Sequence, residues 1–555
     1  MAYNWEEISV REVVLLEKIR IQNVRSLKDT GDVPLSPITL LVGENSSGKS
    51  TFLRTFPLLR QSISKRTDGP ILWAGDVDDY VDFGSFDETV TNDGSTDMTF
   101  SFSFEATTSR KYIMRSPNGR MARQEFPFPM DIGALPDHIT YSITISRAGM
   151  REHVSKLHVT YNNATFTFNL SPQHKRPNVI VDGSYDYPLS QKEDARAPIY
   201  FPVSRIFEYD LPNITRTFNE LFSLLGGDDK ARAEYQQEDD EDDFALDYDY
   251  RRVVTICQMI GVCLLTGLSW DEIQAHAIFK GKEDKDPFLT IIIRKLGNFS
   301  SGKRSDALAS CKLAGFRAVL PYIEDYLSAY FRQVHYIAPL RATAERYYRL
   351  RNLSIDEVDY QGKNLAMFLN GLTRSKLQSF QSWTRKYFGF EIDVKRDGGH
   401  ISVQVALTNG NGFINISDTG FGYSQILPII TQLWVLSTSI RRPVGEATPL
   451  VIAIEQPELH LHPALQAKLA NAFRASIELA KKNHCNLQLL IETHSETIVN
   501  FFGRAIARKI MSPKDVSVVL FEKKREQNQT EVRISQYDEA GYLQNWPLGF
   551  FAPEE

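Results

Sequence analysis

The chain has 555 residues, too many for one small hydrophobic core, and its length predicts two to four lobes. Its hydrophobic content of 42% and charged content of 24% are ordinary for a globular protein, and its net charge of −6 excludes an overall electrostatic attraction to nucleic acid. The four cysteines form no CxxC pair and no apolar run approaches the ~20 residues that cross a bilayer, so we expect a protein of the reducing cytoplasm with no membrane partner.

The first predicted elements are a strand over residues 14–24, a second strand over residues 38–42 and a helix that begins at Ser50. The loop before the helix, GENSSGKS, fits the pattern G-x4-G-K-[ST]. In this pattern the glycines let backbone N–H groups surround a phosphate, the lysine reaches the β- and γ-phosphates, and the hydroxyl binds Mg²⁺. The predicted nucleotide-binding residues are Gly43, Asn45, Ser46, Gly48, Lys49, Ser50 and Thr51.

The pattern of apolar and polar residues changes twice in the middle of the chain. Over residues 95–204, short runs such as TYSITIS and ATFTFNL alternate apolar and polar residues, which is typical of an antiparallel sheet with one buried face. Over residues 205–335 the pattern is helical and lacks the heptads of a coiled-coil arm. An acidic run at residues 238–243 is typical of a solvated loop, and a metal or a basic partner is the alternative.

Strands return after residue 385, and the segment DTGFGYSQ at residues 418–425 then precedes an apolar helix. Two glycines and a serine at the start of a helix make an anion site. Lys49 already serves the phosphates of its own subunit. We therefore expect Gly422, Ser424 and Gln425 to cap the nucleotide of a second copy, with an ordinary helix cap as the alternative.

Two further apolar strands end in polar side chains. Residues 450–454 predict a buried parallel strand that ends in Glu455, and a carboxylate there can hold Mg²⁺ beside a phosphate loop. Ser50 and Glu455 are therefore the predicted metal ligands. Another apolar strand runs into His494, which would sense the γ-phosphate or orient the attacking water, and a structural histidine at a strand end is the alternative.

The order of these segments predicts an α/β protein. Residues 1–94 and 336–555 are expected to build one ATPase head around a mostly parallel sheet. Residues 95–204 would form the antiparallel β lobe, and residues 205–335 a helical insertion.

The four motifs, in this order, resemble those of ABC/SMC-type ATPases, and more closely the AAA-15 group related to OLD and RecF-type ATPases. VGENSSGKST is similar to the Walker A loop, VIAIEQPELHLHP to the Walker B strand with its D-loop, SDTGFGYSQILPI to the signature motif and IETHSE to the H-loop. The resemblance implies an ABC-type P-loop head that holds ATP and Mg²⁺ between two copies of the chain. A homodimer through ATP is therefore expected, and such dimers can build a higher assembly.

One position departs from the pattern. Gln456 stands where the resemblance places the glutamate that activates water. An amide cannot accept that proton, and a general base contributes about 10²–10⁴ to the rate. Hydrolysis is therefore expected to be slow or triggered by a partner unless Glu458 substitutes. Glu455, Gln456, Glu458 and His494 are the predicted catalytic set.

Stand-alone ATPases of this kind resemble the ATPase subunits of Septu-type antiviral defence systems, some of which accompany retrons. That resemblance implies an HNH nuclease as a partner, and a reverse transcriptase with its reverse-transcribed DNA as further partners. Two alternatives stay open: a RecF-like DNA-repair ATPase that binds DNA directly, and a non-hydrolysing scaffold stabilised by ATP. Arg341, in the segment PLRATAERYY, could sense the nucleotide, pair with the acidic run or form a structural salt bridge.

Overall fold

The computed structural model describes residues 16–65, 67–76, 79–106, 137–149, 151–170, 177–191, 209–210, 256–279, 287–351, 355, 357–407, 412–438, 449–524 and 529–547. The chain divides into two compact units. The head unit comprises residues 13–66, 71–98 and 329–555, and the insert unit comprises residues 1–12, 67–70 and 99–328. The acidic run at residues 238–243 lies outside the described residues.

The centre of the head unit is a seven-stranded sheet with the order β13-β18-β19-β4-β20-β21-β22. Neighbouring strands from β13 to β20 pair in parallel, and β21 and β22 add antiparallel pairs at one edge. Every residue of β4, β18 and β19 is buried, which explains their continuous apolar sequences. The strands are β13 (Val334–Ile337), β18 (Leu450–Glu455), β19 (Leu487–Glu492), β4 (Ile38–Gly43), β20 (Val516–Lys524), β21 (Gln529–Tyr537) and β22 (Leu543–Gln544).

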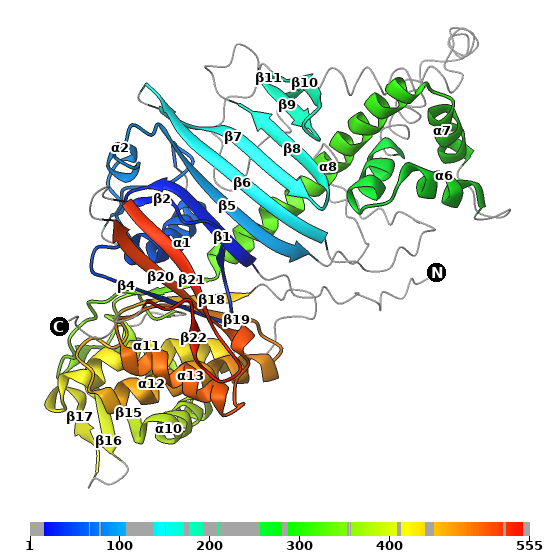
Figure 1. Cartoon of the computed structure of the whole chain (residues 1–555). Helices are drawn as coiled ribbons and strands as arrows, with labels where there is room; N and C mark the ends of the chain where they lie inside the picture. The colour runs from blue at the N-terminus through cyan, green and yellow to red at the C-terminus, as the bar shows by residue number, and fades with distance from the viewer. Residues whose placement is uncertain are drawn as a thin grey trace, which may run out of the picture. The chain divides into compact units, whose positions relative to one another are not determined.

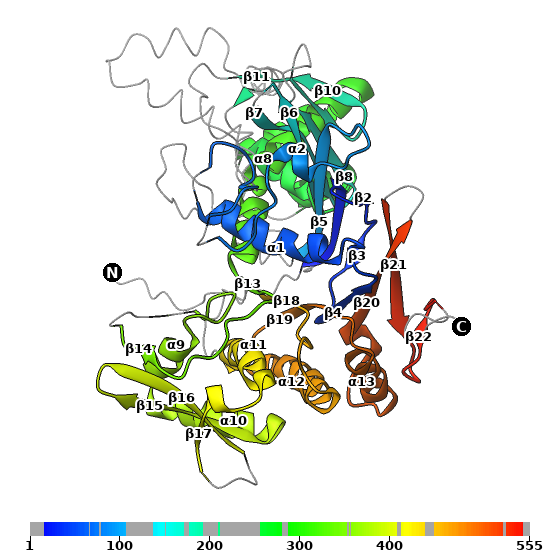
Figure 2. The ribbon, with the colours of Figure 1, turned by 90° about the vertical axis from the view of Figure 1, so that its left-hand side faces the viewer.

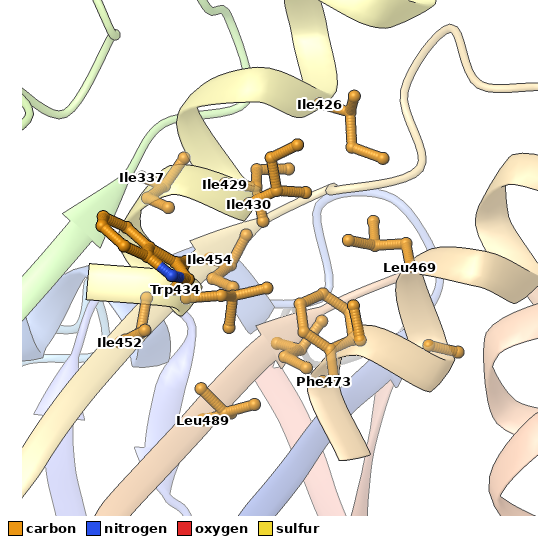
Figure 3. Packing of buried hydrophobic residues seen from close by; sticks show 14 of the residues in the cluster. Ile337, Ile426, Ile429, Ile430, Trp434, Ile452, Ile454, Leu469, Phe473 and Leu489 are labelled. Atoms are coloured by element: carbon orange, nitrogen blue, oxygen red, sulfur yellow. The ribbon is translucent and has the colours of Figure 1, made fainter. Parts of the chain in front are cut away.

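Helices cover both faces of this sheet. Helix α1 lies on one face, and α11, α12 and α13 lie on the other (Figures 1 and 2). Apolar side chains of α11 and α12, such as Trp434 and Phe473, meet Ile452, Ile454 and Leu489 of the strands (Figure 3). Burying one such side chain stabilises a fold by ~1.5–3 kcal/mol, so this layer fixes the strand ends on which the site stands. The helices are α1 (Lys49–Ser64), α11 (Phe421–Thr438), α12 (Pro463–Lys482) and α13 (Glu496–Ala507).

Smaller elements complete the head unit. The antiparallel strands β1, β2 and β3 carry a tight turn at residues 25–26, where Arg25 has a φ of 51°. A short helix, α2, has a capping box formed by Ser85 and Glu88. A second, antiparallel sheet is formed by β14, β15, β16 and β17. The bounds are β1 (Leu16–Val24), β2 (Leu27–Asp29), β3 (Val33–Pro34), α2 (Phe86–Thr89), β14 (Tyr348–Arg349), α9 (Leu365–Gly371), α10 (Arg374–Phe388), β15 (Phe390–Asp397), β16 (His400–Leu407), β17 (Ile414–Asn415) and the 3₁₀ turns η2 (Ile416–Asp418) and η3 (Pro513–Asp515).

The insert unit contains an antiparallel sheet in which β5 to β10 are neighbours in chain order. Helix α8 runs along this sheet (Figure 1), and Phe316 of the helix stacks on Phe166 of β8 with ring centroids 4.1 Å apart. Lys312 of the same helix pairs with Asp182 at 2.6 Å. The bounds are β5 (Asp97–Ala106), β6 (Asp137–Ala148), β7 (Arg151–Tyr161), β8 (Ala164–Asn169), β9 (Asn178–Val181), β10 (Tyr185–Pro188), β11 (Ser190–Gln191), β12 (Tyr209–Asp210), α6 (Trp270–Phe279), α7 (Pro287–Gly297) and α8 (Ser301–Arg332).

The expected α/β class is confirmed. The mostly parallel arrangement, however, describes the seven-stranded sheet alone, because the large sheet of the insert unit is antiparallel. The domain boundaries drawn from the sequence stay a prediction. Among the described residues, no helix combines the length and the apolar character needed to cross a membrane.

Candidate nucleotide-binding site

The phosphate loop joins the buried end of β4 to the start of α1. Gly48, the residue before the helix, has a φ of 93°, a conformation that side chains other than glycine rarely adopt. A Cβ atom on Gly48 would lie 2.8 Å from Ser26 Oγ and 2.9 Å from Leu27 Cδ2. The loop thus packs directly on the turn between β1 and β2, and glycine is required at this contact.

Lys49 is the first residue of α1 and is only 3% exposed. Its Nζ donates to the carbonyl oxygens of Gly43 at 3.1 Å and Glu44 at 2.6 Å, so the ammonium lies inside the loop. Burial lowers the pKa of Lys49, and nearby carboxylates, first among them Glu492, oppose that shift. A buried cation at the positive end of a helix is suited to an anion.

An open cavity of about 320 Å³ lies beside the loop, a size typical of ligand sites. It contains six of the seven loop residues predicted to bind nucleotide, together with Gln456 and His494. Gly43, whose carbonyl oxygen accepts from Lys49 Nζ, is not among the lining residues. The lining residues are Arg25, Ser26, Asn45, Ser46, Ser47, Gly48, Lys49, Ser50, Thr51, Gln456, Glu492 and His494.

Two carboxylates stand side by side at the carboxyl ends of neighbouring strands. Glu455 ends β18, Glu492 ends β19, and the two residues are register partners in the parallel ladder. Each is 2% exposed. Paired buried carboxylates repel each other, so each needs a cation, a proton or donors.

Glu455 has all of its donors within the chain. Its Oε1 accepts from Arg54 Nε at 2.7 Å and from the Tyr336 hydroxyl at 2.7 Å, and its Oε2 accepts from Arg54 Nη2 at 2.8 Å. The hydrogen bond to Glu455 raises the pKa of Arg54. Burial, followed by the charge of Glu455, raises the pKa of Tyr336. Glu455 as a Mg²⁺ ligand stays a prediction, and both of its oxygens are engaged here.

Glu492 makes the contact with Ser50. Its Oε1 accepts from Ser50 Oγ at 2.9 Å, whereas its Oε2 is buried and no described residue donates to it. Burial, and then the charge of Glu455, raise the pKa of Glu492 to about 7. An unpartnered buried carboxylate oxygen costs free energy, so this atom marks a place where a cation or a donor fits.

The remaining predicted catalytic residues lie in the turns after the two strands. Gln456 lines the cavity with a positive φ of 43°, and its N–H donates to Glu492 O at 2.9 Å. His494 lines the cavity too, and partial burial, followed by the charge of Lys49, lowers its pKa. Glu458 is absent from the cavity lining described above. Its Oε1 accepts from the His494 N–H at 2.6 Å, and burial raises its pKa.

The signature segment begins helix α11 and is likewise not among the residues that line the cavity. The helix begins at Phe421, so Gly422 and Ser424 lie in its first turn, Gln425 follows directly, and Ser424 is not the helix cap. Ser424 is 7% exposed, and its hydroxyl donates to Phe421 O at 2.7 Å. Capping of a nucleotide held by another copy stays a prediction.

Arg341 is buried and binds the turn after β18. Its Nη2 donates to the carbonyl oxygens of Glu455 at 2.9 Å and Gln456 at 3.2 Å, and it is 6% exposed. Its Nε and Nη1 atoms have no hydrogen-bond partner among the described residues, and burial lowers its pKa to about 10. Arg341 therefore fixes the backbone that carries Gln456.

Sequence reasoning misses several residues of the site. Glu492 receives no role of its own from the motif that contains it, although it ends an apolar strand as Glu455 does. Arg54 lies one helical turn after Ser50, the spacing that places both on one face of α1. Arg25 lies in a turn whose proximity to the loop depends on tertiary packing, so no local signal could place it.

These residues fit ATP with Mg²⁺. The loop and Lys49 suit the phosphates, while Ser50 Oγ and the unpartnered Glu492 Oε2 are the oxygen donors that Mg²⁺ prefers. When bound, the ion would neutralise phosphate charge and polarise the terminal phosphoryl group.

A glycine-rich loop between a parallel strand and a helix, with Lys49, Ser50 and strand-end carboxylates around one cavity, defines a P-loop nucleotide-binding ATPase. The chain belongs to the AAA ATPase domain family (AAA_15), whose model matches residues 15–219 and 352–499. Membership of an ATPase family implies the use of ATP and usually of Mg²⁺.

Two solved structures are similar to the chain. One is an Smc head bound to the C-winged helix domain of ScpA, with 9% identity and a TM-score of 0.33, covering 94% of this chain and 97% of that chain. The other is the SMC head domain from Thermotoga maritima, with 10% identity and a TM-score of 0.32, covering 93% of this chain and 98% of that chain. No curated protein matches the sequence.

Proposed function

We propose that the chain is an ATPase subunit that binds ATP and Mg²⁺ in the cavity around Lys49. The observation that carries this proposal is the buried ammonium of Lys49 at the start of α1, in a loop that opens onto a cavity of ligand size. Oriented backbone N–H groups, a helix N-terminus and a cation together are a phosphate site.

A second copy would complete the site through the start of α11. Ser424 and Gly422 lie in the first turn of that helix, outside the cavity of their own chain. Phe421 at the helix start is 46% exposed. The start of α11 is thus accessible, as a homodimer closed over ATP requires.

Turnover at this site is expected to be slow. Gln456 lines the cavity and stands at the motif position where the resemblance places a general base, and one oxygen of Glu458 accepts from the His494 N–H. Bound ATP would then hold the dimer closed for a long time, which suits a regulatory subunit better than a motor.

We further propose that the dimer controls a partner HNH nuclease in a bacterial antiviral complex, in some cases with a reverse transcriptase and its reverse-transcribed DNA. The support is the resemblance of the four motifs to Septu-type ATPase subunits. Co-expression with the genes beside its own tests this. Co-purification of a nuclease and loss of phage protection in a Lys49→Ala strain would support the proposal. Binding of bare DNA ends, or a repair neighbourhood, would replace it with the RecF-like alternative.

ATP binding is tested by equilibrium dialysis of labelled ATP with Mg²⁺. Lys49→Ala should weaken binding at least about tenfold, because a buried charge contact to phosphate is lost. Lys18→Ala, which removes an exposed lysine of β1, is the matched control and should bind as wild type does. Failure of the wild-type protein to take up ATP would end the proposal.

A further inference from the structure

The two buried carboxylates at the strand ends are not equivalent, although the sequence presents both as the last residue of an apolar strand. Glu455 and Glu492 are register partners and each is 2% exposed. Their surroundings differ in the donors that each receives. The number of donors that each carboxylate receives indicates which of the two can bind a metal ion.

Both oxygens of Glu455 already accept hydrogen bonds from the protein. Arg54 binds it in a bidentate pair with N–O distances of 2.7 and 2.8 Å, and the Tyr336 hydroxyl adds a third hydrogen bond. Bidentate guanidinium–carboxylate pairs are among the strongest charge-assisted contacts in proteins. A metal ion would have to break this pair and leave Arg54 facing a second cation.

Glu492 has the opposite arrangement. Its Oε1 accepts from Ser50 Oγ at 2.9 Å, so it already touches the hydroxyl that binds Mg²⁺ in phosphate loops. Its Oε2 is buried without a donor from any described residue, and Glu492 lines the cavity whereas Glu455 does not. A hard cation with oxygen ligands is the species that satisfies such an atom at a phosphate site.

We infer that Glu492, and not Glu455, is the protein carboxylate that holds the magnesium ion with Ser50, through its Oε2 atom or one water of the ion. Glu455 is then a positioning residue that anchors Arg54 and Tyr336 behind the site. The inference rests on the proposed function, since the ion enters with the phosphates of ATP. Magnesium is commonly bound through one or two carboxylates plus substrate phosphates.

The test replaces Mg²⁺ by Mn²⁺ and follows its binding by electron paramagnetic resonance in the presence of a non-hydrolysable ATP analogue. Glu492→Gln keeps the shape of the side chain and removes its charge. We expect it to weaken Mn²⁺ binding about 10–100-fold, as loss of a metal-supporting carboxylate usually does. Binding of the analogue in EDTA should remain within about threefold of wild type, which also shows that the variant is folded. Ser50→Ala is the positive control.

Glu455→Gln is the matched comparison, because it makes the same chemical change on the neighbouring strand. We expect its Mn²⁺ affinity to fall by less than about threefold. Should it not fold, Tyr336→Phe removes one donor from Glu455 and is expected to leave Mn²⁺ binding unchanged. Should Glu492→Gln not fold, Glu492→Asp withdraws the carboxylate by one carbon and is expected to weaken Mn²⁺ binding.

Wild-type-like Mn²⁺ binding in Glu492→Gln, or a larger loss in Glu455→Gln, would overturn the inference while leaving ATP binding intact. If the wild-type protein fails to bind the analogue both in EDTA and with Mn²⁺, the proposed function itself fails. The two failures are therefore distinguishable.

Discussion

At the scale of single residues, Gln456 holds an unusual backbone conformation at the cavity. It faces the cavity with a φ of 43°, and its backbone is fixed by Glu492 on one side and by Arg341 on the other. A residue held in this sparsely populated conformation is costly unless its surroundings impose it. The backbone therefore holds this side chain at the cavity, while its amide cannot accept a proton.

Replacing Gln456 by glutamate should supply the missing base. We expect Gln456→Glu to raise steady-state ATP hydrolysis about 10–100-fold, within the range of general-base catalysis, because the fixed backbone already aims the side chain. Phosphate release measures the rate, and Gln456→Ala is the control that removes the amide without adding a base. Brisk wild-type turnover with no gain in Gln456→Glu would refute this explanation.

Glu357 stabilises the head unit through a partly buried ion pair. Glu357 accepts from Arg60 at 2.9 and 2.7 Å and contacts His335 Nδ1 at 2.7 Å, and Arg60 also donates to Val334 O, so the ion pair ties α1 to β13. Burial alone would raise the pKa of Glu357, but the hydrogen bonds from Arg60 and His335 outweigh it and lower the pKa to about 2. A lowered carboxylate pKa stabilises the fold above the unfolded value of 4.5, and this stabilisation is lost as pH falls from 4.5 towards 2.

Glu357→Gln should therefore lower the free energy of unfolding at pH 7 by about 1–2 kcal/mol, a figure reduced for the third of the side chain that meets water. Urea unfolding from about pH 7 to about pH 3.5 measures it, and the gap from wild type should narrow only below about pH 4.5. Glu539→Gln removes an exposed carboxylate and should change little. A gap that stays constant with pH would show that the charge of Glu357 is not the cause.

At the scale of elements, the apolar runs at residues 38–42, 450–454 and 489–491 each form a strand, because a buried parallel strand leaves a continuous apolar signature. The sequence therefore indicates which segments meet around the nucleotide. It does not indicate which polar side chains touch. The pairing of Ser50 with Glu492 instead of Glu455 follows from the strand order β18-β19-β4, which puts β19 next to the phosphate loop.

Helix starts are also harder to predict than helix cores. The apolar run beginning at Ile426 indicates α11, yet the helix begins at Phe421, because glycines and polar residues are tolerated in a first turn whose N–H groups need no intrahelical partner. Ser424 consequently lies within the first turn, where its hydroxyl donates to a backbone carbonyl.

Two helices of the insert unit pack closely at a pair of glycines. A helical segment that includes Gly261 crosses α8 at Gly315, where a Cβ atom on Gly315 would lie 2.6 Å from Gly261 C and Val262 N. Contact this close is possible only without side chains. Gly315→Ala should push the two helices apart and lower stability by about 1–3 kcal/mol, the usual cost of overpacking.

Thermal unfolding of the full chain measures this cost, and ATP binding should be unaffected because the cavity belongs to the head unit. Gly302→Ala is the matched control on the same helix, since a Cβ atom there meets nothing within 4 Å. That control should be neutral or stabilising by ~0.5–1 kcal/mol through helix propensity. Equal effects of the two variants would mean that the helices do not cross at Gly315.

At the scale of the whole molecule, the cavity of one chain opens to solvent. The cavity is lined by the β1–β2 turn, the phosphate loop and the ends of β18 and β19, and the start of α11 is not among its lining residues. Arg25 brings a positive charge to its wall, where its Nη2 donates to Phe83 O. Under the proposed function, a triphosphate held by Lys49 would remain open to solvent until a second copy covers it.

If Lys49 of one copy and Ser424 of another form one site, two different defective chains should restore each other's dimerisation. A role of Ser424 within its own chain would not produce this effect. Lys49→Ala removes the phosphate grip from its own chain, and Ser424→Arg places a bulky cation at the start of α11 while leaving its own Lys49 intact. Neither variant alone should form an ATP-dependent dimer, because both sites of each homodimer lack one half. Ser424→Arg should still bind ATP as a monomer, which shows that it is folded.

Mixing the two variants should restore one complete site per heterodimer, formed by Lys49 of the Ser424→Arg chain and Ser424 of the Lys49→Ala chain. Fluorescence transfer between differently labelled chains should therefore reappear on addition of ATP and Mg²⁺. The two chains should bind each other more weakly than two wild-type chains do, because only one of the two sites is complete. Ser382→Arg, on the exposed side of α10, controls for an added surface charge. If the mixture stays monomeric while each variant behaves as described alone, Ser424 acts within its own chain, because a group that works across the interface must be complemented by an intact partner.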